Sequence, residues 1–443
     1  MTANRMRAGV LFGALLAFYG GAHAFAQAAS DPNRPQIDLT ISGSAVRQIP
    51  IAIPALQSPS AALASGNAQA GETIRSVVSA DLLYSGLFNV LPPSLYETVT
   101  SAPGRIPLRD FAAIGAQGVV SATLSTDASG IVVEGLLFDS KSEALITGKR
   151  YRGAASLARD IAHRIANDVL IAYTGRAGVS LSRLVMVGKV SGAKEIFVMD
   201  YDGSDIKQLT KNGTLNMSPA WSPDGRRLAF VSYRQGNPRL YIYSGEDGSL
   251  HDSTPPGSEL CVAPEWAPDG RSIAFSSSSS GDSEIFVLDV ATGRSKQITF
   301  SRGSDTAPAW SPSARELAFT SDRSGSPQVY LMDAEGANIR RLSFEGDYND
   351  SAAWSPSGDR IAYASRKDGR FDILVHDVRS GRTSRLTQNS GNNENPRWSP
   401  DGRHIVFSSN RRGSYRIYTM DADGNRQESI DTPFEATMPD WSH

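Results

Sequence analysis

The side chains that most often carry catalysis or bind metals are few and scattered in this sequence. Its single cysteine, Cys261, excludes an internal disulfide framework and a cysteine-rich zinc site. The sequence contains no G-x-S-x-G nucleophile motif, no H-E-x-x-H and no G-x-x-x-x-G-K-[ST] phosphate loop. We therefore expect no enzyme and no catalytic, cofactor-binding or metal-binding residue. The histidines beyond the first 26 residues, none of them paired at a helical metal-ligand spacing, are His163, His251, His376, His404 and His443.

Two acidic stretches resemble pieces of a calcium-binding loop. They are residues 200–205, which read DYDGSD, and residues 421–425, which read DADGN. Both lack the complete twelve-residue pattern with its terminal glutamate, and both stand where the chain must turn between two strands. We interpret them as turns. Cys261 is interpreted as a small buried residue beside the strand that carries Trp266.

All six tryptophans of the chain belong to one repeat. They are separated by 43 to 45 residues, and the phrase around the first of them reads SPAWSPDGRRLAF. A sialidase Asp box, S-x-D-x-G-x-x-W, places its tryptophan after the glycine, whereas here tryptophan comes first, so a sialidase is not predicted. The six tryptophans are Trp221, Trp266, Trp310, Trp354, Trp398 and Trp441.

Each repeat predicts four short strands. The strand that ends at Trp221 runs into S-P-D-G at residues 222–225, and proline at the second position with glycine at the fourth favours a type I turn. Three further strands follow before the next tryptophan, and a repeat of this length with four strands is typical of a β-propeller blade. In the third repeat Ser313-Ala314 replaces Asp-Gly, so we expect a different backbone type in that turn.

The two ends of the repeat array predict how the ring closes. The first unit, from Arg183, lacks a preceding tryptophan strand, and the last, around Trp441, has only that strand. Joining them completes a sixth blade and removes two open sheet edges. We therefore predict a six-bladed β-propeller over residues 182–443, closed by the carboxy-terminal strand.

A different domain precedes the propeller. Residues 37–177 predict a small α/β domain, with strands over 37–41 and 49–53, a helix over 71–84, a hairpin over 119–138 and a third strand over 145–151. A last helix over 154–173 should turn Leu157, Ile161, Ile165 and Val169 inward. The whole is an α+β two-domain protein.

The first residues predict export. Arg5 and Arg7 precede an apolar run that is too short to span a membrane, and Ala24-Phe25-Ala26 fits a signal cleavage site. We expect a signal peptide over residues 1–26, a flexible leader over 27–36, no membrane span in the mature chain, and a periplasmic location. Since 44 Lys and Arg oppose 46 Asp and Glu, no basic field points to nucleic acid.

Binding is the function that remains for this fold. The loops that precede the tryptophan strands share one face of the propeller with the loops between second and third strands. These second loops supply arginines, among them Arg323, Arg366 and Arg411. Arginine clusters on concave loop surfaces suit protein interfaces, so we expect a protein-binding face.

The combination of these features resembles a known family. An exported α/β domain with the segment AHRIAN at residues 162–167, an ending YTG at 173–175 and six W-S-P-D-G-type blades are similar to the TolB family of the Tol-Pal cell-envelope system. The resemblance implies a non-enzymatic periplasmic scaffold. It would bind the peptidoglycan-associated lipoprotein Pal through the propeller and TolA through the mature N-terminal segment, supporting outer-membrane integrity and division. It also implies capture by some colicins, contacts with other outer-membrane or peptidoglycan-associated proteins, and a possible Ca²⁺ in the channel.

The resemblance also points to residues. The segment SDTAP at 304–308 is similar to the family's Pal-contacting loop, which makes Thr306, with its neighbour Asp305, the first candidate. Asp350, Glu394 and Thr437 occupy the position equivalent to Thr306, four residues before a tryptophan. A carbohydrate-binding propeller acting on cell-wall glycan is the alternative; it would need exposed aromatic side chains in the same loops. The candidates for that role are Tyr348, Phe371 and Tyr415.

Overall fold

The computed structural model describes residues 48–58, 65–97, 99, 106–128, 130–258 and 260–442. The signal peptide, the leader and the strand expected over 37–41 lie outside these residues. Within the described ranges, no helix combines the length and the apolar character needed to cross a membrane.

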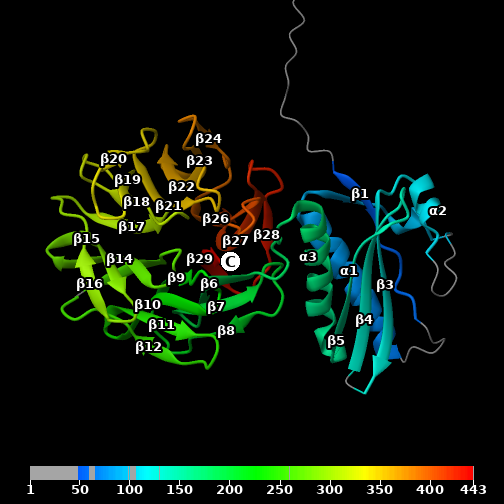
Figure 1. Cartoon of the computed structure of the whole chain (residues 1–443). Helices are drawn as coiled ribbons and strands as arrows, with labels where there is room; N and C mark the ends of the chain where they lie inside the picture. The colour runs from blue at the N-terminus through cyan, green and yellow to red at the C-terminus, as the bar shows by residue number, and fades with distance from the viewer. Residues whose placement is uncertain are drawn as a thin grey trace, which may run out of the picture. The chain divides into compact units, whose positions relative to one another are not determined.

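The described residues of the amino-terminal part form one mixed sheet, three α-helices and two short 3₁₀ helices (Figure 1). Its elements are β1 (Ile49–Ala52), α1 (Ser65–Tyr84), β2 (Phe88–Val90), η1 (Pro93–Leu95), α2 (Leu108–Ala113), β3 (Gly118–Asp127), β4 (Gly130–Asp139), β5 (Leu145–Gly153), η2 (Ala155–Leu157) and α3 (Ala158–Thr174). The sheet order is β2-β1-β3-β4-β5, with β1 parallel to β2 and β3, and with β3, β4 and β5 antiparallel. The predicted hairpin and its third strand are confirmed.

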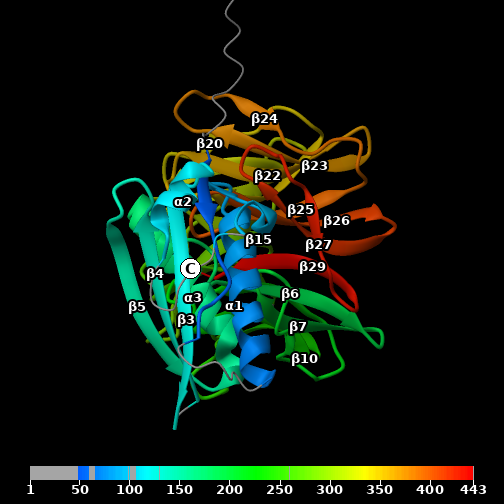
Figure 2. The ribbon, with the colours of Figure 1, turned by 90° about the vertical axis from the view of Figure 1, so that its right-hand side faces the viewer.

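Helices α1 and α3 lie side by side and pack on this sheet (Figure 2). The predicted inward residues Ile161, Ile165 and Val169 of α3 are buried, as the apolar spacing requires. The prediction that Leu157 faces inward is wrong, because the chain forms the short 3₁₀ turn η2 there before α3 begins. The Leu157 side chain is 43% exposed. Gly175 ends α3 with φ +72°, a conformation that favours glycine.

Six four-stranded sheets form the propeller. The first blade joins β29 (Glu435–Trp441) to β6 (Arg183–Val190), β7 (Ala193–Asp200) and β8 (Lys207–Gln208). The second and third are β9 (Asn216–Trp221), β10 (Arg227–Gln235), β11 (Asn237–Ser244), β12 (Leu250–Asp252) and β13 (Cys261–Trp266), β14 (Ser272–Ser280), β15 (Asp282–Asp289), β16 (Arg294–Gln297). The fourth and fifth are β17 (Asp305–Trp310), β18 (Glu316–Ser321), β19 (Gln328–Asp333), β20 (Arg340–Arg341) and β21 (Tyr348–Trp354), β22 (Arg360–Lys367), β23 (Arg370–Asp377), β24 (Thr383–Arg385). The sixth is β25 (Asn393–Trp398), β26 (His404–Arg412), β27 (Ser414–Asp421), β28 (Glu428–Ile430).

The first strands of the blades form the inner ring. Each of β9, β13, β17, β21, β25 and β29 contacts the next, and β29 returns to β9. The ring closes as predicted, because β29 pairs antiparallel with β6 and sets Trp441 opposite Leu184. The indole N–H of Trp441 donates to Ser182 Oγ at 2.6 Å, which ties the last strand to the start of the first blade.

Residues 47–443 form one compact unit. Side chains near the end of helix α1 contact side chains of the propeller. The hydroxyl of Tyr201 donates to Asp81 Oδ1 at 2.5 Å, and Asp81 Oδ2 lies 2.8 Å from His163 Nδ1. The ring of His404 stacks on Tyr84 with centroids 4.3 Å apart. Asp81, His163 and His404 are all buried, so two of the scattered histidines serve this junction.

The turn expected to differ in the third tryptophan repeat has the same form as its sisters. Ala314 has φ +57°, beside +66° to +71° for the glycines at the same position, and its N–H donates to Ser311 O at 2.9 Å as in the other turns. The expectation was wrong because the turn's hydrogen bond holds the backbone in the left-handed region despite the Cβ of alanine. The sister glycines are Gly225, Gly270, Gly358 and Gly402.

A substitution in this turn should stabilise the protein. Ala314→Gly should raise the free energy of unfolding by about 0.5 kcal/mol, since relief of the left-handed alanine outweighs the added freedom of the unfolded chain. The reverse change at a sister turn, Gly402→Ala, should lower it by about 1 kcal/mol. Urea unfolding of both variants measures the pair. Equal signs for the two changes would contradict the assignment of strain to this position.

Candidate partner-binding face

Every inner strand carries the same backbone irregularity. The residue three positions before each tryptophan has φ between +48° and +56°, and the pairing with the neighbouring strand shifts register there. Such β-bulges bend a strand and redirect its side chains. The six residues are Ser218, Ala263, Ala307, Ser351, Asn395 and Met438.

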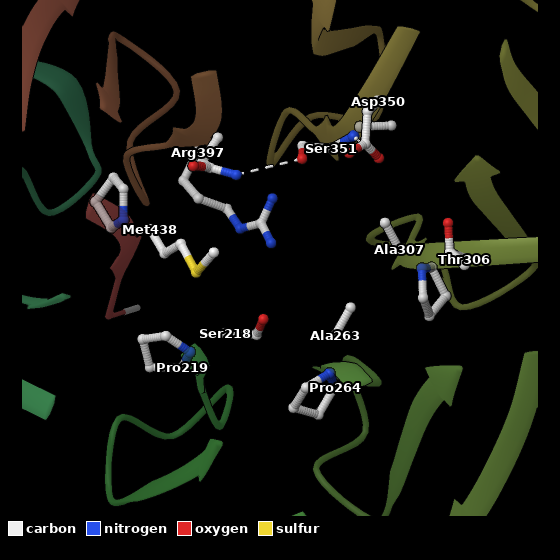
Figure 3. A pocket seen from close by; sticks show the side chains of 14 residues that line it. Ser218, Pro219, Ala263, Pro264, Thr306, Ala307, Asp350, Ser351, Arg397 and Met438 are labelled. Carbon is white, nitrogen blue, oxygen red and sulfur yellow. Dashed lines mark hydrogen bonds between the residues drawn. The ribbon is translucent and has the colours of Figure 1, made fainter. Parts of the chain in front are cut away.

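These six bulges surround one mouth of the propeller channel. They line a cavity of about 230 Å³ together with prolines of the inner strands (Figure 3). Across it, Asn395 Nδ2 donates to Ser351 Oγ at 3.3 Å, which links two adjacent blades. The bulges therefore turn the ends of six inner strands into one open, polar-rimmed depression.

Two of the predicted site residues reach this cavity. Thr306 and Asp350 both line it, from adjacent blades (Figure 3). Thr306 lies opposite Thr320 in the strand pairing, and the Thr320 hydroxyl donates to Asp350 Oδ1 at 2.7 Å. The N–H of Ser351 donates to the same oxygen at 2.6 Å, so the carboxylate is fixed in place. Asp350 is therefore a pre-ordered polar group on the edge of the cavity that Thr306 also lines.

Two others do not line the cavity. Glu394 Oε1 accepts a hydrogen bond from the Tyr415 hydroxyl at 2.8 Å. Burial, reinforced by this carboxylate, raises the pKa of Tyr415 to about 12. Thr437 lies opposite Val187 in the pairing that closes the ring. The equivalence of position with Thr306 therefore does not produce equal access to the mouth.

The predicted arginines are held within their own blades. Arg323 Nη2 donates to the buried Asp305 at 2.7 Å, and Arg366 Nε donates to Asp347 at 3.1 Å. Arg411 donates to Asn393 Oδ1 at 2.8 Å and lies over the ring of Tyr418. The structure brings Asp305 and Arg323 together as one ion pair, next to Thr306 in the sequence.

The aromatic residues of the glycan alternative are also engaged. Tyr348 and Phe371 pack edge to face with centroids 5.6 Å apart, and the Arg366 guanidinium lies over both rings. Tyr348, Phe371 and Tyr415 are each only partly exposed. In the part of the chain that the structure describes, these loops present no freely exposed aromatic ring of the kind that a sugar platform needs.

Buried amides connect neighbouring blades, and the sequence analysis missed them. In three repeats the residue five positions before tryptophan is asparagine, and its side chain donates to an acid or amide of the preceding blade, as from Asn216 to Glu195 at 3.0 Å and from Asn349 to Gln328 at 2.8 Å. A hydroxyl two residues beyond the fourth strand of that preceding blade donates to the same acceptor, as from Thr210 to Glu195. The recurring Asn-x-x-x-x-Trp spacing could have revealed this connection.

The remaining chemical candidates have structural roles. Asp202 pairs with Arg159, and Ser204 N–H donates to Asp202 Oδ1 at 3.1 Å, which confirms a turn at residues 200–205. Cys261 is buried, and burial raises the pKa of its thiol to about 11. Among the described residues, no three His, Cys, Asp or Glu side chains gather as a metal site.

Replacing Asp305 should stabilise the protein by an amount that depends on pH. It occupies the place that asparagine holds in three blades; burial, and then its charge, raise the pKa of Glu284 in the preceding blade. A raised acid pKa in the folded chain means that stability falls as pH rises through that pKa. Asp305→Asn should therefore raise the free energy of unfolding by about 1 kcal/mol at pH 8 and by less at pH 5.

Urea unfolding at both pH values measures this change. The control is Asp347→Asn, which removes the exposed partner of Arg366 and should change stability by less than about 0.5 kcal/mol. A loss of stability in Asp305→Asn at both pH values would show that the Arg323 pair outweighs the repulsion between the two acids.

Comparisons with known proteins place the chain in a family. Residues 172–443 match the family described as the TolB beta propeller domain, and residues 37–146 match the TolB amino-terminal domain. The crystal structure of TolB from Acinetobacter baumannii is similar with a TM-score of 0.77 and 27% identity, over 89% of this chain and 97% of that one.

Curated relatives agree. The Tol-Pal system protein TolB of Cereibacter sphaeroides (strain ATCC 17025) is 34% identical over 54% of this chain and 53% of its own length. That of Anaeromyxobacter dehalogenans (strain 2CP-C) is 34% identical over 52% of each chain. The chain thus spans about half the length of these curated relatives. Since the propeller match alone covers more than half of its residues, the chain belongs to the TolB family.

Proposed function

We propose that this protein is a non-enzymatic, periplasmic scaffold that binds the lipoprotein Pal at the mouth of its propeller. Its relatives carry the name Tol-Pal system protein TolB, which supports a partner from that system. The observation that carries the proposal is the open cavity that Thr306 and Asp350 line, on which hydrogen bonds hold the Asp350 carboxylate in place. A rigid, concave, polar-rimmed surface loses little conformational entropy on binding, which suits a protein partner.

The second part of the proposal concerns the mature N-terminus. We assign residues 27–36 to the binding of TolA, so that the chain connects an inner-membrane protein with an outer-membrane lipoprotein and supports envelope constriction at division. Contacts with other outer-membrane or peptidoglycan-associated proteins fit the same role. Deleting residues 27–36 should abolish binding to soluble TolA in calorimetry and leave the melting temperature unchanged; retained TolA binding would place that site elsewhere.

Calorimetric titration tests the Pal assignment. The mature chain should bind the soluble Pal domain of its own organism with one-to-one stoichiometry. Thr306→Arg should weaken the affinity at least about tenfold, because a long charged side chain fills the mouth and a burial mismatch of this kind costs at least about 1.4 kcal/mol.

The matched control is Ser313→Arg. Ser313 is exposed in the turn at the other end of the same inner strand, so this variant should keep the wild-type affinity. Absence of Pal binding at high micromolar concentrations would contradict the partner. Equal weakening by both arginine variants would contradict the face.

A further inference from the structure

The residue just before each tryptophan points to a second feature of the channel. In three repeats it is alanine: Ala220, Ala309 and Ala353. In the other three it is charged: Glu265, Arg397 and Asp440. Because all six positions lie on the inner ring of strands, charges far apart in the sequence are brought toward one axis.

Arg397 lies between two cavities. It lines the mouth described above and also a second cavity of about 340 Å³ that the six tryptophans surround. It is the one residue that these two cavities share among the described residues. The guanidinium therefore occupies the channel between its two ends.

The three charges form one cluster. Arg397 Nε lies 3.4 Å from Asp440 Oδ1, and Arg397 Nη2 lies 3.7 Å from Glu265 Oε2. The three side chains are between 13% and 25% exposed, and Asp440 Oδ2 also accepts the backbone N–H of Trp221 at 2.7 Å. Charges that are largely shielded from water are stabilised by charged partners, and here each carboxylate faces the same cation.

This cluster does not fit the calcium ion that the family resemblance allows in the channel. Ca²⁺ takes six to eight oxygen ligands, and carboxylates among them supply the negative charge that balances the ion. Here two carboxylates share the space with a guanidinium, whose positive charge would repel a second cation. The described residues add no third acidic side chain to them.

We propose that Arg397 is the permanent internal cation of this channel: it neutralises Glu265 and Asp440 in place of a divalent metal, so that the channel takes up no Ca²⁺. Two carboxylates and one guanidinium leave one negative charge. Burial raises the pKa of Glu265 to about 7, so its protonation near neutral pH removes that excess.

The test uses the mature chain alone, so its failure is distinct from failure of the Pal assignment. Calorimetric titration of CaCl₂ into the wild type should give no saturable heat, and 5 mM CaCl₂ should leave the melting temperature as it is in EDTA. Arg397→Gln should lower the melting temperature at pH 8 by roughly 5 °C or more, and by less at pH 5.5, where Glu265 is protonated. Arg397→Lys, which keeps the charge, should recover part of the loss.

A surface pair supplies the control. Arg226→Gln removes an exposed partner of Glu246, at 3.0 Å, and should shift the melting temperature by less than about 1 °C. Saturable Ca²⁺ binding to the wild type that Glu265→Gln abolishes would overturn the proposal. An Arg397→Gln variant as stable as the wild type at pH 8 would also overturn it.

Discussion

The structure of the propeller depends on one strand pairing, that of β29 with β6. Before this pairing forms, the first blade lacks its inner strand and both ends of the array present open sheet edges. Once it forms, the six inner strands contact one another in a closed ring. The channel, its mouth and its charged centre all lie on that ring. Each is therefore built from residues that stand about 44 positions apart along the chain or at its two ends.

Buried polar groups keep the blades in register around the ring. Apolar sheet faces alone would pack with many sliding arrangements, whereas an amide such as Asn216 that must reach Glu195 in the preceding blade fixes one of them. The same strands then bend at a left-handed residue, and Thr306 and Asp350 both line the cavity at that end of the strands. Hydrogen bonds from Thr320 and Ser351 hold Asp350 in place at the rim, and a binding surface benefits from such order.

Much of this architecture follows from the sequence by local rules. The tryptophan period, the S-P-D-G turns and the complementary terminal units predict six blades and their closure. The bulges could not be predicted in this way, because residues such as Ala263 and Ala307 carry no left-handed preference and take that conformation only through strand pairing. The prediction for the turn at Ala314 was wrong because the turn's own hydrogen bond holds alanine in the left-handed region. The prediction for Leu157 was wrong because a 3₁₀ turn displaces the start of the helix. The contact between Glu265 and Arg397 could not be predicted from either repeat alone, because it depends on both residues holding the same position before a tryptophan of the inner ring.

We propose that Pal docks on the cavity ringed by the bulges. Amide hydrogen exchange of the mature chain, with and without the soluble Pal domain, tests this claim most directly. We expect slower exchange on Pal binding in residues 304–308 and 348–352, with unchanged exchange in the turns at 222–225 and 399–402 on the opposite ends of the inner strands. Protection confined to those turns, or to the amino-terminal sheet, would contradict it.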